Sequence, residues 1–445
     1  MTPNDDFRSL HHQLPPNIRR RVAAGDLEGA VRLIDRCLAD GLQPQLAPRL
    51  RCERERLLRL PSNYSIPLEE GLALLREEWL DVTEEQVRTL MDAGRIDWRY
   101  IDGKPHLHSR FLPSLRLYPK DAPGLTAAAP EGVSKEGALL EQMAREGHLS
   151  ASVTLRASIR PAEGVEGREL QAWLPIPAAC PQQSHIELLE FTPGGVAAPE
   201  DAPQRTLWWK SDSLREFSVT YRYHIRADYA DLSRLKADPV QPTFCLEEEP
   251  PHLWFSPYLR ELAEHITRGL TDPLDRARAI YDYVTNTVDY RFQPDYFQLP
   301  PIADLCAREL RGDCGLFALL FIALCRLSGI PAQWQSGLAV NEREAGCHDW
   351  AMFYIAPHGW LWADCSYGSS ARRKGDEARR RHYFGNLDPW RMVANRRCLA
   401  PLTPPSPGWR HDPYDNQLGE MTVDGRGLLG CEMERSVDVV EFRLL

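Results

Sequence analysis

The stretch Gly312-Asp313-Cys314-Gly315-Leu316-Phe317-Ala318 places a thiol at the start of an apolar helix, and the apolar run continues to Leu324. Gly329 and Pro331 predict the end of this helix, because glycine adopts the left-handed terminal conformation and proline cannot continue the helical hydrogen bonds. We expect the Asp313 side chain to cap the helix by accepting a backbone N–H. The free N–H groups and the helix dipole then favour the thiolate form of Cys314. On its own, a cysteine in an apolar helix also fits simple packing.

Two strands are predicted after this helix, over residues 347–354 and 359–364, separated by a turn signal at residues 356–359. They place His348 and Asp364 on neighbouring strands. A regular even-numbered turn would point these two side chains to opposite faces of the sheet. If the two residues act together, we expect an odd-length connection or a bulge, for which Gly359 can supply a positive φ.

Four features in this order resemble the transglutaminase-like superfamily, whose core is papain-like. They are the G-D-C-G-x-F-A helix start, the C-R-x-x-G-I-P-A ending from Cys325 to Ala332, the H-x-W strand at His348 and the tryptophan-containing strand that ends at Asp364. The resemblance covers roughly residues 246–400. It implies a catalytic triad in which Cys314 is the nucleophile, His348 moves the proton and Asp364 orients the imidazole.

This triad implies chemistry on amide bonds of proteins or peptides through a thioester acyl-enzyme, which water or an amine resolves. No cofactor and no metal are expected. Gln293 and Gln298 precede the cysteine, and either could supply a side-chain donor to the oxyanion. One alternative is a zinc site made by Cys314, Cys347, His348 and Cys365, although these residues lack paired-ligand spacing. The other is a catalytically inactive transglutaminase-like scaffold or binding protein.

The composition is that of an ordinary globular protein, with 445 residues, 43% hydrophobic and 26% charged. The formal charge of −10 argues against a general binder of nucleic acid or anionic membranes. No apolar run reaches the roughly 18 residues of a membrane span, and the acidic N-terminus lacks the apolar region of a secretory signal. The 11 cysteines contain no C-x-x-C pair and fit reduced thiols. We expect a cytoplasmic protein with a protein or peptide substrate, bound to neither nucleic acid nor membrane; the sequence carries no signal for an oligomeric state.

Residues 1–122 are predicted to form a helical N-terminal region with one small β-hairpin. Asp26 is a candidate N-cap before a helical apolar pattern, Thr83 and Gln86 form a capping box, and Asp102-Gly103 is a hairpin turn. The arginine-rich helices predict a solvated face, or alternatively a docking surface for an acidic partner. Helices followed by a hairpin also suggest a winged-helix DNA-binding unit, although no basic recognition helix follows.

The chain as a whole is predicted to be an α+β multidomain protein. Residues 123–148 form a linker and a short helix. Residues 149–245 alternate apolar and polar side chains, most clearly from Phe217 to Ile225, which predicts an antiparallel β-sandwich. The catalytic core over residues 246–400 follows, and residues 401–445 form a turn-rich C-terminal extension. Its acidic and amide residues at 412–420 lack the spacing of an EF-hand loop, so no calcium site is predicted.

Overall fold

The computed structural model describes residues 3–41, 44–126 and 133–445. The chain divides into two compact units, one made of residues 1–4, 134–289 and 301–445 and the other of residues 5–133 and 290–300. Residues 127–132 of the predicted linker lie outside the described part of the chain.

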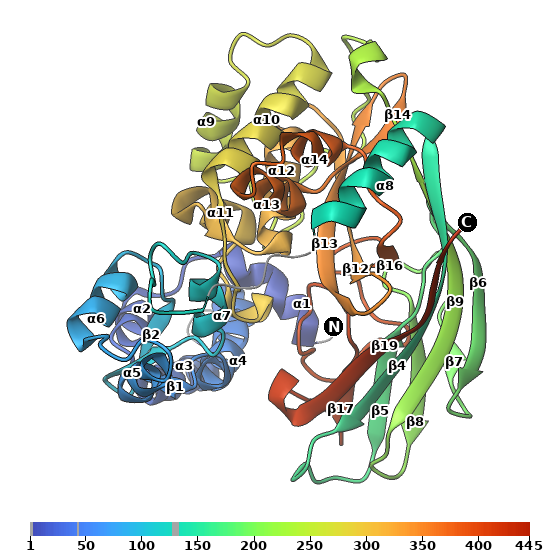
Figure 1. The fold of residues 1–445 in the computed structure, drawn as a ribbon. Helices are drawn as coiled ribbons and strands as arrows, with labels where there is room; N and C mark the ends of the chain where they lie inside the picture. The colour runs from blue at the N-terminus through green and yellow to red at the C-terminus, as the bar shows by residue number, and fades with distance from the viewer. Residues whose placement is uncertain (1–2, 42–43, 127–132) are drawn as a thin grey trace. The chain divides into compact units, whose positions relative to one another are not determined.

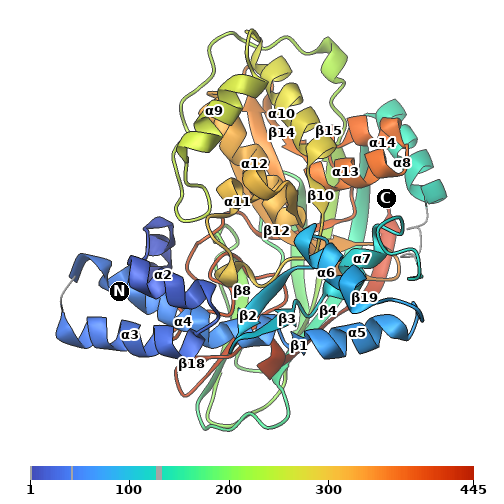
Figure 2. The same cartoon turned by 90° about the vertical axis from the view of Figure 1, so that its left-hand side faces the viewer.

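The larger unit contains an antiparallel five-stranded sheet with the order β15-β14-β13-β12-β16. Helices cover one face of this sheet, with α12 packed on β12 and β13 (Figure 2). The strands are β12 (Ala332–Val340), β13 (Ala345–Ile355), β14 (Gly359–Ala363), β15 (Phe384–Gly385) and β16 (Arg391–Asn395). The helices are α9 (Pro257–Ile266), α10 (Pro273–Thr287), α11 (Ile302–Glu309), α12 (Cys314–Leu327), α13 (Cys365–Arg373) and α14 (Glu377–His382). A two-stranded ribbon pairs β10 (Asp289–Tyr290) with β11 (Arg311–Gly312).

The central helix α12 is buried from Cys314 to Arg326, as its continuous apolar sequence predicts. It ends where expected, because Gly329 adopts φ +75° just beyond it. Two neighbouring helices begin with side-chain caps followed by proline. Ser256 accepts from the Leu259 N–H at the start of α9, and Asp272 accepts from Leu274 and Asp275 at the start of α10.

The hairpin that joins β13 to β14 has the odd length expected from the sequence. Ile355 pairs with Gly359, so three residues lie between the paired positions. Gly359 has φ +91° and sits where the connection ends. Since paired residues share a face and the pairing continues in register to Ala351 and Ala363, His348 and Asp364 point to the same side of the sheet.

The predicted β-sandwich is present in the same unit and consists of two antiparallel sheets (Figure 1). One has the order β18-β17-β5-β8-β7 and the other the order β19-β4-β9-β6. Their strands are β4 (His148–Pro161), β5 (Leu170–Pro175), β6 (Gln183–Phe191), β7 (Val196–Ala197), β8 (Thr206–Ser211), β9 (Phe217–Asp228), β17 (Glu420–Val423), β18 (Arg426–Gly427) and β19 (Met433–Leu444). Helix α8 (Val133–Glu146) packs on this sandwich through Met143, which contacts Leu149 and Ala227.

Residues 401–445, which the sequence suggested as an extension, complete the sandwich. Strand β17 pairs with β5, and β19 pairs with β4 along its length. The sandwich also shares its hydrophobic core with the helix-covered sheet, because Leu338 and Met392 pack among the sandwich side chains. The sandwich and the sheet that carries His348 are therefore one packed body.

The smaller unit is largely helical, with a small sheet of order β1-β3-β2. Its elements include α2 (Pro16–Ala23), α3 (Leu27–Asp40), α4 (Ala47–Asn63), β1 (Ile66–Pro67), α5 (Leu68–Arg76), α6 (Glu84–Asp92), β2 (Trp98–Ile101), β3 (Lys104–Leu107) and α7 (Phe111–Arg116). The predicted caps form: Asp26 accepts from Gly29 N–H, and Thr83 and Gln86 make the reciprocal capping box. The segment 290–300 belongs to this unit; Arg56, for example, donates to the carbonyl oxygen of Phe297.

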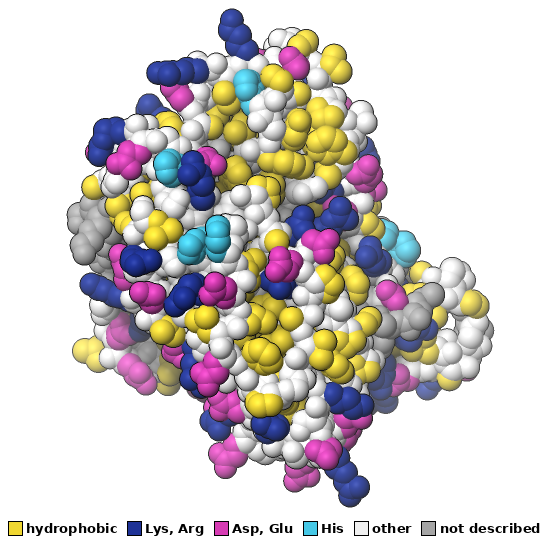
Figure 3. Space-filling view, turned by 90° about the vertical axis from the view of Figure 1, so that its right-hand side faces the viewer, with side chains coloured by type: hydrophobic (Ala, Val, Ile, Leu, Met, Phe, Trp, Pro, Cys, Tyr) yellow, Lys and Arg dark blue, Asp and Glu magenta, His cyan; other side chains and the backbone are white. Residues whose placement is uncertain are grey.

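Acidic and basic side chains are intermingled on the surface drawn in Figure 3, with hydrophobic patches between them. No helix among the described residues is long and apolar enough to cross a membrane.

Candidate active site

Cys314 occupies the first position of α12, where the sequence placed it, and only 9% of its surface is exposed. Asp313 is the N-cap residue, but its side chain makes no capping hydrogen bond. The predicted cap contact is therefore wrong. The backbone places Asp313 in an extended conformation, with φ −101° and ψ −168°.

The thiol of Cys314 donates a hydrogen bond to Asp349 Oδ2 over 3.1 Å. Burial raises the pKa of this thiol well above its ordinary value, and the negative charges of Asp349 and Asp313 raise it further. The expectation of a lowered thiol pKa is thus wrong for this arrangement. The helix dipole favours thiolate, but desolvation and a carboxylate in contact with the sulfur outweigh it.

His348 and Asp364 form a buried pair, with 2.7 Å between Nε2 and Oδ2. Asp364 also accepts hydrogen bonds from the Ser366 hydroxyl and the Tyr367 N–H, because it caps α13. Burial alone would raise the pKa of Asp364, but His348 and Arg391 hold it well below its usual range. The bond at Nε2 leaves Nδ1 as the imidazole nitrogen that can exchange a proton with a thiol.

A fully buried arginine supports this pair. Arg391 donates to Asp364 Oδ2 over 2.8 Å and makes two bonds to Asp388, of 2.8 and 3.0 Å. Its guanidinium lies over the ring of Tyr367, which in turn stacks on the His348 ring with 4.4 Å between centroids. The orientation of His348 is therefore determined from two sides, by a carboxylate and by an aromatic ring.

His348 and Asp349 are successive residues of β13, and their pairing with Gly337 and Ser336 of β12 is continuous. Side chains of successive strand residues leave on opposite faces. The structure thus brings His348 to Asp364 and brings Cys314 to Asp349. Within the described ranges, no hydrogen bond joins Cys314 directly to His348.

The partners of Cys314 on this side of the sheet were not among the predicted site residues. Gln417 Nε2 donates to Asp349 Oδ1 and to Asp415 Oδ2, the latter over 2.6 Å. Ser336 also donates to Asp415 Oδ2, over 2.6 Å. Available signals were the acidic residue directly after His348 and the acid-and-amide cluster at 412–420, which the sequence alone could not place next to the cysteine.

The other candidates are placed as follows. Gln293 and Gln298 both lie in the segment 290–300 of the smaller unit; Gln293 Nε2 donates to the Arg291 carbonyl oxygen, whereas Gln298 is buried. In the part of the chain that is described, no group of three or more His, Cys, Asp or Glu side chains is arranged to hold a metal ion, as the zinc alternative requires.

One family model covers the segment of the chain that contains Cys314, His348 and Asp364. The family model of the transglutaminase-like superfamily matches residues 260–365. No curated protein matches the chain significantly. A solved candidate cysteine protease from Cytophaga hutchinsonii has 16% identity and a TM-score of 0.42, covering 66% of this chain and 91% of its own. The periplasmic domain of TgpA from Pseudomonas aeruginosa has 13% identity and a TM-score of 0.28, covering 54% of this chain and 95% of its own.

Proposed function

We propose that this chain, whose residues 260–365 belong to the transglutaminase-like superfamily, is a cysteine-dependent enzyme that acts on amide bonds of proteins or peptides. The observation that carries the proposal is the buried His348–Asp364 pair on the strand against which the Cys314 helix packs. A thiol at a helix N-terminus and a histidine oriented by a carboxylate are the two halves of a cysteine nucleophile system.

In the proposed reaction the Cys314 sulfur attacks the carbonyl carbon of the amide as His348 Nδ1 takes the thiol proton. The tetrahedral intermediate carries its negative charge on the former carbonyl oxygen, where the backbone N–H of Cys314 can stabilise it. His348 then returns the proton to the leaving amine, and the carbon–nitrogen bond breaks. A thioester remains on Cys314. Water or an amine attacks this thioester and releases the acyl group, restoring the thiol.

We favour hydrolysis over transfer to an amine. A transferase must admit an amine while excluding water, which an apolar tunnel achieves. Trp350 is fully buried and donates from its indole nitrogen to Gln335, and Trp360 packs edge-on against Tyr354. These contacts support a packing role for the tryptophans that could otherwise line such a tunnel.

A second candidate is an inactive scaffold or binding protein. The bond from Cys314 to Asp349 favours it, because burial and this carboxylate raise the pKa of the thiol. Activity requires the sulfur to leave Asp349 and deliver its proton to His348. In an inactive scaffold that exchange does not occur.

The decisive experiment incubates the protein with a peptide library and a labelled primary amine. Peptide cleavage or ammonia release that disappears in Cys314→Ala supports hydrolysis, and Cys314-dependent incorporation of the amine supports transfer. Cys347→Ser is the matched control, since Cys347 is an exposed cysteine on β13, outside the Cys314 helix. Absence of both reactions across the library favours the scaffold.

The proposal includes a protein or peptide substrate, no cofactor, no nucleic acid and no membrane partner. It also includes a cytoplasmic location, because the 11 cysteines are present as thiols, which suits a reducing compartment.

A further inference from the structure

The smaller unit contains a cavity of about 440 Å³ that the proposed function does not use. Helices α2 and α4, strand β2 and the segment 290–300 contribute its walls, and all of them belong to this unit. The volume lies within the roughly 300–1,000 Å³ that is typical of sites for small organic ligands. Tyr100 borders the cavity and is 44% exposed, so a ligand can enter from solvent.

Most of the lining is apolar or aromatic. Helix α2 contributes Val22, and α4 contributes Leu57 and Leu60. The rings of Trp98 and Tyr100 on β2 meet edge to face, with 5.0 Å between their centroids. A lining of this kind favours a ligand with an apolar or aromatic body.

The polar part of the lining carries an excess of positive charge. Arg56 and Arg49 on α4 both donate to the same oxygen of Glu53, over 2.7 and 2.8 Å. Burial alone would raise the pKa of Glu53, but Arg56 and Arg49 hold it below its usual range, so this carboxylate is charged at neutral pH. Two guanidiniums therefore share one carboxylate. Arg99, which also lines the cavity, pairs with Asp97.

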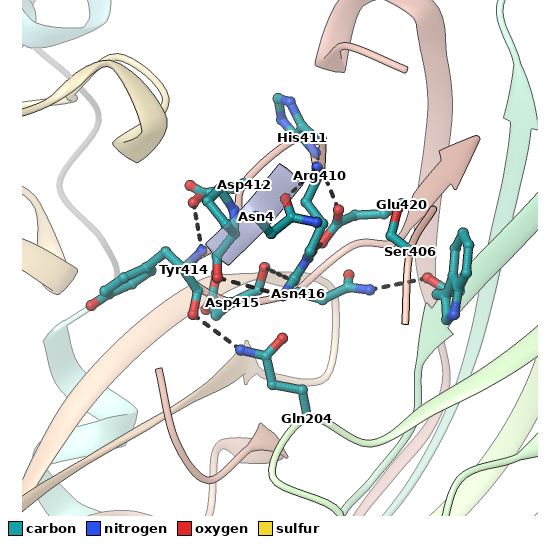
Figure 4. A network of polar contacts seen from close by, with 12 residues as sticks. Asn4, Gln204, Ser406, Arg410, His411, Asp412, Tyr414, Asp415, Asn416 and Glu420 are labelled. Carbon is teal, nitrogen blue, oxygen red and sulfur yellow. Dashed lines mark hydrogen bonds and ion pairs between the residues drawn. The ribbon is translucent and has the colours of Figure 1, made fainter. Parts of the chain in front are cut away.

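The buried network of the larger unit in Figure 4 has a different charge ratio. There Arg410 forms an ion pair with Glu420 over 2.6 Å and donates to the carbonyl oxygen of Asp415 over 2.8 Å. One guanidinium meets one carboxylate in that pair, whereas α4 sets two guanidiniums against one carboxylate.

A buried donor in the lining of the cavity lacks an acceptor. Gln298 is 7% exposed, and its Nε2 makes no hydrogen bond to any residue that the structure describes. The main chain at this position is held in place, because Arg56 donates to the carbonyl oxygens of Phe297 and Gln298. An unsatisfied buried N–H is destabilising, and an oxygen atom of a ligand would satisfy it.

We propose that this cavity binds a carboxylate that carries an apolar or aromatic body. The carboxylate accepts from Gln298 Nε2 beside Arg56, where it balances the excess positive charge, and the body packs against Trp98 and Tyr100. A free aryl or alkyl acid and the C-terminal residue of a peptide both offer this chemistry. The inference does not depend on the proposed function, since none of Cys314, His348 and Asp364 lines the cavity. It gives Gln298, a candidate oxyanion donor in the sequence, a binding role instead.

Saturation-transfer NMR with 3-phenylpropionate and the full chain tests the assignment. We expect saturation transfer to the aromatic protons of this acid. The neutral isostere 3-phenylpropanamide should bind at least about tenfold more weakly, because hydrogen bonds to a charged acceptor are stronger. N-acetyl-alanyl-phenylalanine distinguishes the two sources: tighter binding than 3-phenylpropionate identifies a peptide terminus, and weaker binding identifies a free acid.

Two variants with matched controls locate the bound acid. Gln298→Leu removes the donor at similar size and should weaken binding of 3-phenylpropionate about tenfold. Its control is Gln293→Leu, because Gln293 lies in the same segment, donates to the Arg291 carbonyl oxygen and does not line the cavity. Tyr100→Ala removes part of the aromatic wall and should weaken binding at least about threefold. Its control is Tyr258→Ala, which changes a tyrosine of α9 with 38% exposure.

Equal binding of the acid and the amide, or no saturation transfer to the acid at millimolar concentration, overturns the proposal. A folded Q298L variant that binds the acid as tightly as Q293L does the same. Thermal unfolding shows whether each variant is folded. If Q298L is unfolded, binding by Y100A that equals binding by Y258A refutes the assignment.

Discussion

Replacing Arg391 with Met tests whether the network behind His348 is held by a buried cation. Arg391 and the two carboxylates that it contacts, Asp364 and Asp388, are all at most 1% exposed. The substitution keeps an unbranched side chain of similar length but leaves both carboxylates without their arginine partner. Removing one member of a buried ion pair costs about 3–5 kcal/mol, because an uncompensated charge stays buried. We expect a loss of that size in the free energy of unfolding at pH 7.

The pH dependence gives the loss a recognisable signature. Burial raises the pKa of Asp388, but Arg391 outweighs it and holds the pKa below the usual range, as it helps to do for Asp364. In the natural protein this stabilisation is present above the unfolded-state pKa of about 4 and is lost as the pH falls through the lower folded-state values. In R391M the desolvated Asp388 carboxyl has a raised pKa instead. Protonation as the pH falls through that raised pKa removes the buried charge, so the difference in unfolding free energy between variant and natural protein should narrow as the pH falls.

Urea unfolding followed by tryptophan fluorescence at pH 7 and pH 5 measures both effects. Arg381→Met is the matched control, since the Arg381 side chain is 72% exposed and its pair with Glu377 is worth well under about 1 kcal/mol. A loss in R391M below about 1 kcal/mol, equal at both pH values, would refute the reasoning. It would mean that the two carboxylates do not depend on this guanidinium.

Three further predictions concern single residues. Gly359→Ala should cost about 1 kcal/mol in unfolding free energy, because the added Cβ meets no atom but φ is +91°. Gly346→Ala, at the other end of β13, has equal space without a positive φ and should cost less; equal losses would contradict this. Trp350→Ala should lower the free energy of unfolding, measured with denaturant, by about 3–5 kcal/mol, because the side chain is fully buried and its indole N–H donates to Gln335. A loss near zero would show that the core does not depend on this side chain. Burial lowers the pKa of His108 to about 4. The smaller unit should therefore lose about 3 kcal/mol in unfolding free energy as the pH falls from 7 to 4, because the unfolded state takes up the proton at a higher pH. His108→Leu should remove this pH dependence in acid titrations, and an unchanged profile would contradict the prediction.

Local patterns in the sequence predicted the parts of the site that depend on nearest neighbours along the chain. The apolar run after Cys314 specified a buried helix, and Gly329 specified its end. The turn signal at residues 356–359 predicted the hairpin, whereas its odd length was expected only if His348 and Asp364 act together. Each of these features depends on backbone preference and period, which a few adjacent residues carry.

Only the tertiary structure decided what surrounds the thiol. Asp349 follows the candidate histidine directly, yet strand alternation sends it to the other face and against Cys314. Gln417, Asp415 and Arg391 reach the site from segments far along the chain, because β16 and β17 each pair with a distant strand. The sequence alone therefore predicted a nucleophile, a histidine and an aspartate. Whether the sulfur carries its proton depends on the burial and the charges that packing brings to it, which no local pattern encodes.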